Sequence, residues 1–125
     1  MAFGRDTTAE HIKPLEGAVT RRYTVGATVA AGELVSMQSD GYVDPSDSTA
    51  AKMPVLGVAV QAGAVGNRID VVVFGPVICL QEATVGGVIY NSTTAGEPSE
   101  SVAGNQTSAG IAESATVLFV RPANA

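Results

Sequence analysis

The chain has 125 residues, 46% of them hydrophobic but only 5% aromatic, with no Trp, one Cys and a formal net charge of −5. This length predicts one domain that buries a single core without disulfides or metals, and the negative charge argues against a nucleic-acid binder, which needs clustered Lys and Arg. No apolar stretch approaches the roughly 20 residues of a membrane span and the N-terminus lacks a signal peptide's apolar segment, so we expect cytoplasmic synthesis and no membrane partner.

The first 17 residues are polar, and their few apolar side chains follow no regular period. A segment without periodicity has no face to bury, so it predicts an extended N-terminal arm at residues 1–17. We expect this arm to add little to the core and to hold a partner instead. A single β domain is expected to follow at residues 18–125.

Frequent Gly and Pro residues, separated by stretches rich in Val, Ile, Leu and Thr, predict short strands joined by tight turns. The first strand is expected at 18–25, where apolar and polar side chains partly alternate. Residues 27–37 then predict a turn that contains Gly32, followed by an apolar alternating strand. Asp40 and Gly41 then signal a hairpin, because Gly tolerates the positive φ of a tight turn, with Tyr42 and Val43 returning along the preceding strand.

The middle of the chain predicts a loop and then the most deeply buried strands. Residues 44–53 read as a polar loop, with 46–53 as the best place for a single helical turn. A buried strand is expected at 55–61, and another at 68–74, whose three consecutive valines and Phe74 look buried on both faces. Gly75 and Pro76 are expected to break the strand ladder, which resumes at 77–80 around a buried, inert Cys79.

The last third of the chain predicts a surface excursion and a closing strand. Residues 91–109 are rich in Ser, Thr, Gly, Asn and Glu, which indicates a long polar loop with nothing to contribute to the core. A final strand at 115–121 places Thr116, Leu118 and Val120 on one face and Val117, Phe119 and Arg121 on the other. Together these elements predict an all-β fold, a small β-sandwich or β-barrel with at most one short helix.

The residues that could carry chemistry are few. His11 lies in the polar arm, where no cavity could tune its pKa, and one His with one Cys cannot form a zinc site. Asp40, Asp44 and Asp47 lack the spacing of a calcium loop and flank turns that favour Asp. We therefore predict no catalytic residue, no metal and no cofactor, and a structural or binding role.

One alternative involves a carrier lysine. Residues 25–34 are similar to the opening of biotinyl and lipoyl carrier domains, which hold their cofactor on a lysine at a hairpin tip. Lys52 could be that lysine. However, Ala51 replaces the usual Met before it, Pro54 follows two residues later, and Lys52 lies too far beyond Leu34 for the short intervening strand of those domains.

A different family fits more of the chain. Four runs carry the resemblance: Gly-Glu-Leu-Val at 32–35, Val-Leu-Gly-Val-Ala-Val at 55–60, the Gly, Val and turn residues of 66–77, and Gly-Val-Ile-Tyr at 87–90. In this pattern the chain resembles the small capsid decoration, or cement, proteins of tailed bacteriophages. Its motifs are combinations of glycine, valine and turn residues, without a reactive signature.

The resemblance implies a tulip-like β body of the lambda head decoration type, placed on the outside of an icosahedral head in the virion. It also implies homotrimers that bind the major capsid protein and stabilise contacts between its subunits, with no direct contact to nucleic acid. On this hypothesis the arm binds the capsid, with Phe3 and Ile12 as apolar anchors and Arg5 and Asp6 as charges that pair with capsid side chains.

Two further binding roles stay open. The chain could be another virion adaptor, in a tail or a fibre, or a glycan-binding β-sandwich. Glycan sites usually need exposed aromatic platforms, and the sequence offers only Tyr23, Tyr42 and Tyr90 with three Phe residues.

Overall fold

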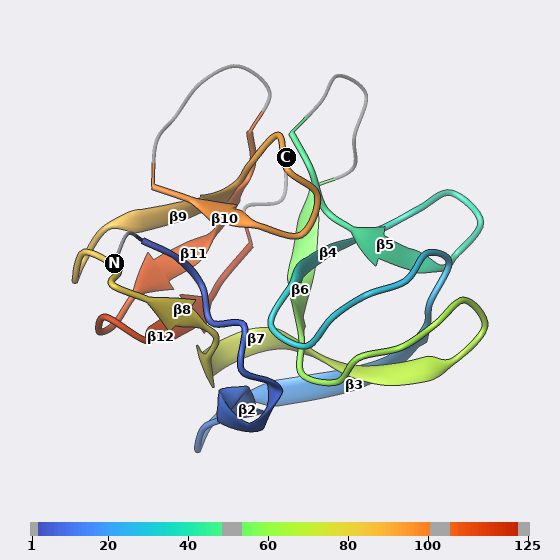
Figure 1. Cartoon of the computed structure of the whole chain (residues 1–125), viewed down its shortest axis with the longest axis horizontal. Helices are drawn as coiled ribbons and strands as arrows, with labels where there is room; N and C mark the ends of the chain where they lie inside the picture. Colours follow the sequence, from blue (N-terminus) through green and yellow to red (C-terminus); the bar gives the residue numbers. More distant parts are fainter. Residues whose placement is uncertain (1–2, 49–53, 101–105, 123–125) are drawn as a thin grey trace.

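The computed structural model describes residues 3–48, 54–100 and 106–122, which form short strands and one 3-10 helix (Figure 1). In chain order the elements are β1 (Gly4–Arg5), the helix η1 (Ala9–His11), β2 (Lys13–Pro14), β3 (Val19–Thr24), β4 (Leu34–Met37), β5 (Val43–Pro45), β6 (Val55–Ala59), β7 (Arg68–Ile78), β8 (Leu80–Gln81), β9 (Val88–Asn91), β10 (Pro98–Ser99), β11 (Ser108–Ala112) and β12 (Val117–Val120). The fold is nearly all-β, with a curled antiparallel sheet that forms a half-barrel, which confirms the predicted fold class.

Several predicted strands are confirmed. The stretches 18–25, 55–61 and 115–121 contain β3, β6 and β12. The hairpin signalled by Asp40 and Gly41 joins β4 to β5, which pair antiparallel. In β12, Leu118 and Val120 are fully buried as the alternation predicts.

One type of turn, with glycine at its third position, precedes many of these strands. Its fourth residue donates a backbone hydrogen bond to the carbonyl of its first, and its third residue is a Gly with φ between +82° and +95°. These features define a type II turn, in which positive φ at the third position favours Gly. The turn occurs at 15–18, 30–33, 64–67, 84–87 and 94–97. It explains why Gly precedes so many of the apolar runs.

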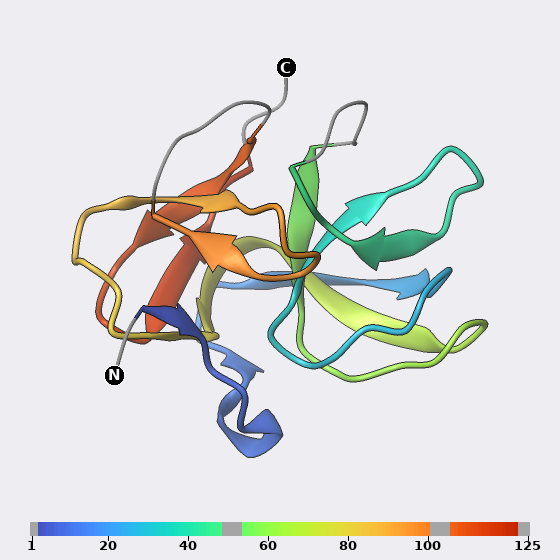
Figure 2. The same cartoon turned by 45° about the horizontal axis from the view of Figure 1, so that its top comes forward.

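The strands divide into two halves that share β7 (Figure 2). In the β3–β6 half, the order β3-β7-β6-β4-β5 curls until Val25, just after β3, bridges Val43 of β5. In the β9–β12 half, the order is β10-β9-β11-β12-β7. One long strand thus ties the two halves together.

Strand β7 is continuous through Gly75 and Pro76, so the predicted break there is wrong. The strand changes partners at this point: its first part pairs with β3 and β6, and residues 75–78 pair with β12. Gly75 has φ +106°, and a Cβ added to it would lie 2.7 Å from Cα of Ala18. Here glycine allows a bend and a close backbone approach, so the ladder is redirected rather than ended.

Strands β4, β6 and β7 lie between two cores. Neighbouring residues in each point to opposite clusters: Val71 lies in the core of the β3–β6 half, and Val72 lies in the larger core that extends through the β9–β12 half. Leu34 and Val35 divide between the two cores in the same way. Burial on both faces explains why these strands read as continuous apolar runs.

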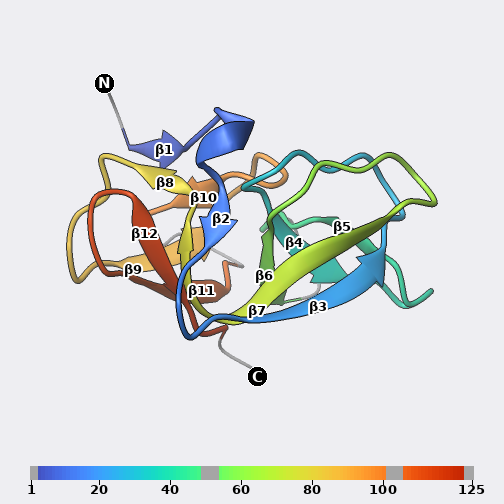
Figure 3. The ribbon, with the colours of Figure 1, turned by 90° about the horizontal axis from the view of Figure 1, so that it is seen from below.

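The N-terminal segment packs on the domain, so the expectation that it adds little to the core is wrong. β1 pairs with β8, and β2 pairs with the end of β7 (Figure 3). Ile12 is 6% exposed and belongs to the larger core, and Phe3 packs against that core. The described helix, η1, also lies in this segment. The helical turn expected at 46–53 falls largely outside the described residues, and Ser46 to Ser48 are not helical.

The stretch 91–109 also contributes to the core, contrary to the prediction of a purely superficial loop. β10 pairs with β9, and β11 begins at Ser108. Asn91 is 1% exposed and Ala109 is fully buried. Small and polar residues at these positions hide the strand pattern, because buried Asn, Ala and Gly do not produce an apolar alternation.

Candidate functional site

The four residues predicted to bind a capsid all contact other parts of this chain. Arg5 Nε donates a 2.7 Å hydrogen bond to Glu97 Oε2, and Arg5 Nη1 donates a 3.2 Å bond to the Ala31 carbonyl. Phe3 and Ile12 pack against the larger core. These three residues make contacts within the chain that hold the segment against the domain.

Asp6 holds the same segment in place through hydrogen bonds at a turn. Its carboxylate accepts the Thr8 N–H at 2.9 Å and lies 2.9 Å from His11 Nδ1, while its own N–H donates to the Cys79 carbonyl. Burial would raise the pKa of Asp6, but these hydrogen bonds and the nearby charges of His11 and Arg5 together lower it below the ordinary 3.8. The stabilisation is therefore present above that value and is lost as pH falls through the lowered pKa.

Cys79 is the buried thiol that the sequence predicts, 1% exposed. Burial, with a smaller contribution from the Asp6 charge, raises its pKa far above the ordinary value. A protonated, enclosed thiol does not react, so alkylation of the native protein should be at least about a thousandfold slower than in denaturant. The measurement is iodoacetamide labelling followed by mass spectrometry. A native rate within tenfold of the denatured rate would contradict this burial.

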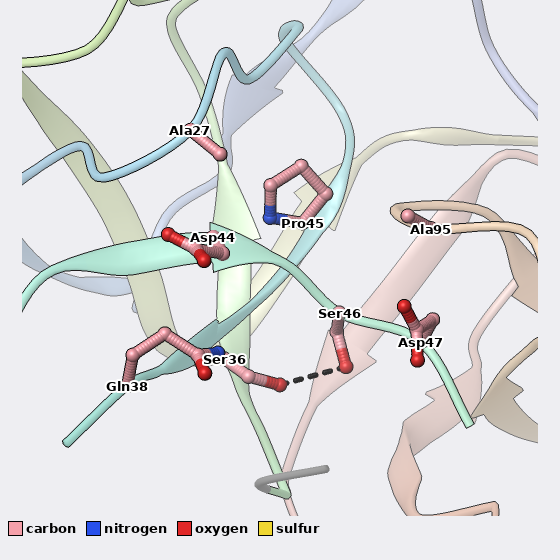
Figure 4. A pocket seen from close by; sticks show the side chains of 8 residues that line it. All are labelled: Ala27, Ser36, Gln38, Asp44, Pro45, Ser46, Asp47 and Ala95. Atoms are coloured by element: carbon pink, nitrogen blue, oxygen red, sulfur yellow. Dashed lines mark hydrogen bonds between the residues drawn. The ribbon is translucent and has the colours of Figure 1, made fainter. Parts of the chain in front are cut away.

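A cavity of about 260 Å³ lies where the end of β5 meets the loop before β10 (Figure 4). Figure 4 shows the hydroxyls of Ser36 and Ser46 pointing toward one another, and Ser36 Oγ donates a 2.7 Å hydrogen bond to Ser46 Oγ. Asn91 Nδ2 donates to Ser46 Oγ at 3.0 Å and to the Asp47 carbonyl at 3.2 Å. This buried polar cluster joins the two halves of the fold.

The chemistry available at this cavity is limited. Asp44, Asp47 and Gln38 add oxygen and amide groups to the lining, and none of the described lining residues has an aromatic ring that could stack on a sugar. Among the described residues, no group of three or more His, Cys, Asp or Glu is placed to hold a metal ion. Lys52, the candidate carrier lysine, lies outside the described residues. We therefore assign the cavity a structural role at the contact between the two halves of the fold.

The outer side of the β9–β12 half carries an apolar surface, hereafter the apolar face, made of the exposed Val19, Phe74, Val88 and Ile111 and the half-buried Pro76 and Phe119. Val88 lies opposite Ile111, Ile111 opposite Phe119, and Phe119 opposite Pro76, which makes one row across four strands. Phe74 packs edge-on against Phe119, with ring centroids 5.2 Å apart. Phe74 is 47% exposed, so its predicted burial is wrong.

Sequence reasoning missed the apolar face, although a signal was present. Both faces of the strand at 115–121 carry large apolar side chains, and only one of them can face the core of a two-layer fold. The exposure of four members of the face lies between 39% and 50%. Such a contiguous patch is characteristic of interaction surfaces.

Strand β3 presents a second surface, an open sheet edge. It pairs with β7 along its whole length and with no other strand in the described part of the chain. Its first four residues are exposed. Arg22 Nε donates to Asp70 Oδ1 at 3.1 Å, whereas no described residue forms an ion pair with Arg21. This edge offers unpaired backbone groups flanked by positive charge.

Comparisons with known proteins add no family assignment. No protein-family model matches the chain, and no curated protein matches it either. Within the described residues, none of the helices has the length and apolar character needed to cross a bilayer.

Proposed function

We propose that this chain is a structural virion protein that binds the outer surface of an icosahedral phage head and stabilises contacts between major capsid subunits. Its proposed partners are the major capsid protein and further copies of itself. The proposal combines the resemblance of the glycine and valine runs to capsid decoration proteins with the surfaces described above. It assigns the chain a role in binding and no catalytic step.

The open edge of β3 carries the proposal. An edge strand can accept an extended segment of another protein as an additional strand, which supplies main-chain hydrogen bonds. Natural monomers commonly shorten or cover such edges, whereas β3 spans six residues, Val19 to Thr24. A docked capsid segment would complete the sheet.

The charges at this edge indicate which kind of partner fits. Two β3 strands pairing antiparallel with each other would bring Arg21 and Arg22 of one copy against those of the other, and like charges in opposite positions destabilise a sheet. With Arg68, which lies opposite Thr24, the edge holds three of the chain's seven basic residues although the net charge is −5. The edge therefore suits an acidic extended segment of a different protein, here assigned to the major capsid protein.

Arg21→Glu tests this assignment, because it reverses an exposed charge that no described residue pairs. The wild-type protein is expected to co-sediment with emptied, undecorated phage heads, and Arg21→Glu to bind at least about tenfold more weakly, equivalent to roughly 1.4 kcal/mol. Arg21→Lys keeps the charge and is the matched control, expected to bind like the wild type. Undiminished binding of Arg21→Glu would remove the β3 edge from the interface, and a wild-type protein that stays in the supernatant would contradict the proposed function itself.

A further inference from the structure

The proposed capsid contact at β3 leaves the apolar face uncovered. Two of the chain's three Phe residues, Phe74 and Phe119, lie on it although aromatic residues are scarce. Solvated sheet faces normally carry polar side chains, and an apolar row across four strands leaves a large unfavourable area in water. A partner that covers this row would remove that cost.

Two exposed charges of opposite sign flank the face along β12. Glu113, in the turn before β12, is exposed at one end, and Arg121, directly after β12, is exposed at the other. Arg121 lines a shallow hollow with Val88 and Ile111, so it borders the apolar face. The six residues of the face itself are uncharged. Along β12 the face thus has a neutral centre with opposite charges at its two ends, and Lys13, which pairs with Ile78, is a further exposed charge at the Glu113 end.

We propose that the apolar face is the contact between two copies of this chain, packed face to face about a twofold axis with their β12 strands antiparallel. In that arrangement Glu113 of each copy meets Arg121 of the other, so this pair is attractive at both ends of the contact. Parallel stacking would instead place each charge against its own kind, which is repulsive. The inference goes beyond the proposed function and differs from the threefold trimer that the resemblance implies.

Sedimentation equilibrium on the free protein measures this contact without any capsid. The expected mass at high concentration is twice the 12.6 kDa of one chain. Ile111→Lys places a charge in the centre of the face and should raise the dissociation constant of the pair at least about a hundredfold, as expected for a central interface residue. Val65→Lys is the matched control: Val65 is 65% exposed on a turn of the β3–β6 half, and the mass should not change.

Charge reversal tests the antiparallel arrangement. Arg121→Glu and Glu113→Arg should each weaken the pair about tenfold, because each sets like charges against one another at both ends. The double variant restores both attractions and should associate within about twofold of the wild type. Circular dichroism and melting of every variant verify that the fold is kept. A wild-type mass of one chain or of three, an unchanged pair in Ile111→Lys, or a double variant as weak as the single ones would overturn the proposal.

Discussion

Removing residues 1–16 is expected to abolish cooperative folding of the domain. The segment supplies Ile12 to the larger core, Phe3 to its margin, and the strands that pair with β8 and the end of β7. Loss of a buried Ile alone costs about 2–5 kcal/mol, and the whole stability of a domain of this size is about 5–15 kcal/mol. We therefore expect the truncated protein to show no sharp thermal transition and to expose apolar surface.

Point variants test whether the packing of Ile12 stabilises the domain, without shortening the chain. Ile12→Ala should lower the free energy of unfolding by about 2–5 kcal/mol, measured by urea denaturation. Thr7→Ala, at an exposed neighbouring position, should change it by less than about 0.5 kcal/mol. A truncated protein that melts cooperatively within a few degrees of the wild type would show that the segment is a passive arm.

Asn91→Ala is also expected to lower the free energy of unfolding by a large amount. The side chain donates to Ser46 Oγ and to the Asp47 carbonyl, and its Oδ1 accepts the Thr107 N–H at 2.9 Å. Because Asn91 is 1% exposed, its removal leaves buried groups without their partner, at about 1–3 kcal/mol for each group. We expect a total loss of about 3–5 kcal/mol in the free energy of unfolding, measured in urea.

Asn67→Ala is the control for Asn91→Ala. Asn67 Oδ1 also accepts a backbone N–H, from Ala64 at 2.9 Å, but Asn67 is exposed and water can replace the bond. Its loss should cost no more than about 1 kcal/mol. Equal effects of the two substitutions would mean that the buried cluster does not hold the two halves together.

The sequence predicted those parts of the fold that depend on local signals. Glycine at the third turn position and alternating or continuous apolar runs identify β3, β4, β6 and β12, because φ preference and side-chain period are properties of neighbouring residues. The N-terminal segment was misread because one buried residue, Ile12, establishes no period. Its pairing with β8 joins residues more than 70 positions apart, which no local pattern reveals.

The binding surfaces were less predictable for a related reason. The adjacency of Arg21 and Arg22 is visible in the sequence, but their place on an open edge depends on which strands pair. Similarly, each of Val88, Ile111 and Phe119 looks like a core residue when it is considered alone in the sequence. Only the register across β9, β11 and β12 shows that they form one row on the solvent side of the sheet.

Cryo-electron microscopy of emptied phage heads incubated with the purified protein tests the proposed function most directly. We expect added density on the outer surface of the head, with the β3 edge of each copy continuing into an extended segment of a capsid subunit. Arg21→Glu, once its melting temperature is shown to match that of the wild type, should leave that density weak or absent. Heads that stay bare with saturating wild-type protein would contradict the proposed function, and copies bound with β3 turned to solvent would contradict the proposed interface.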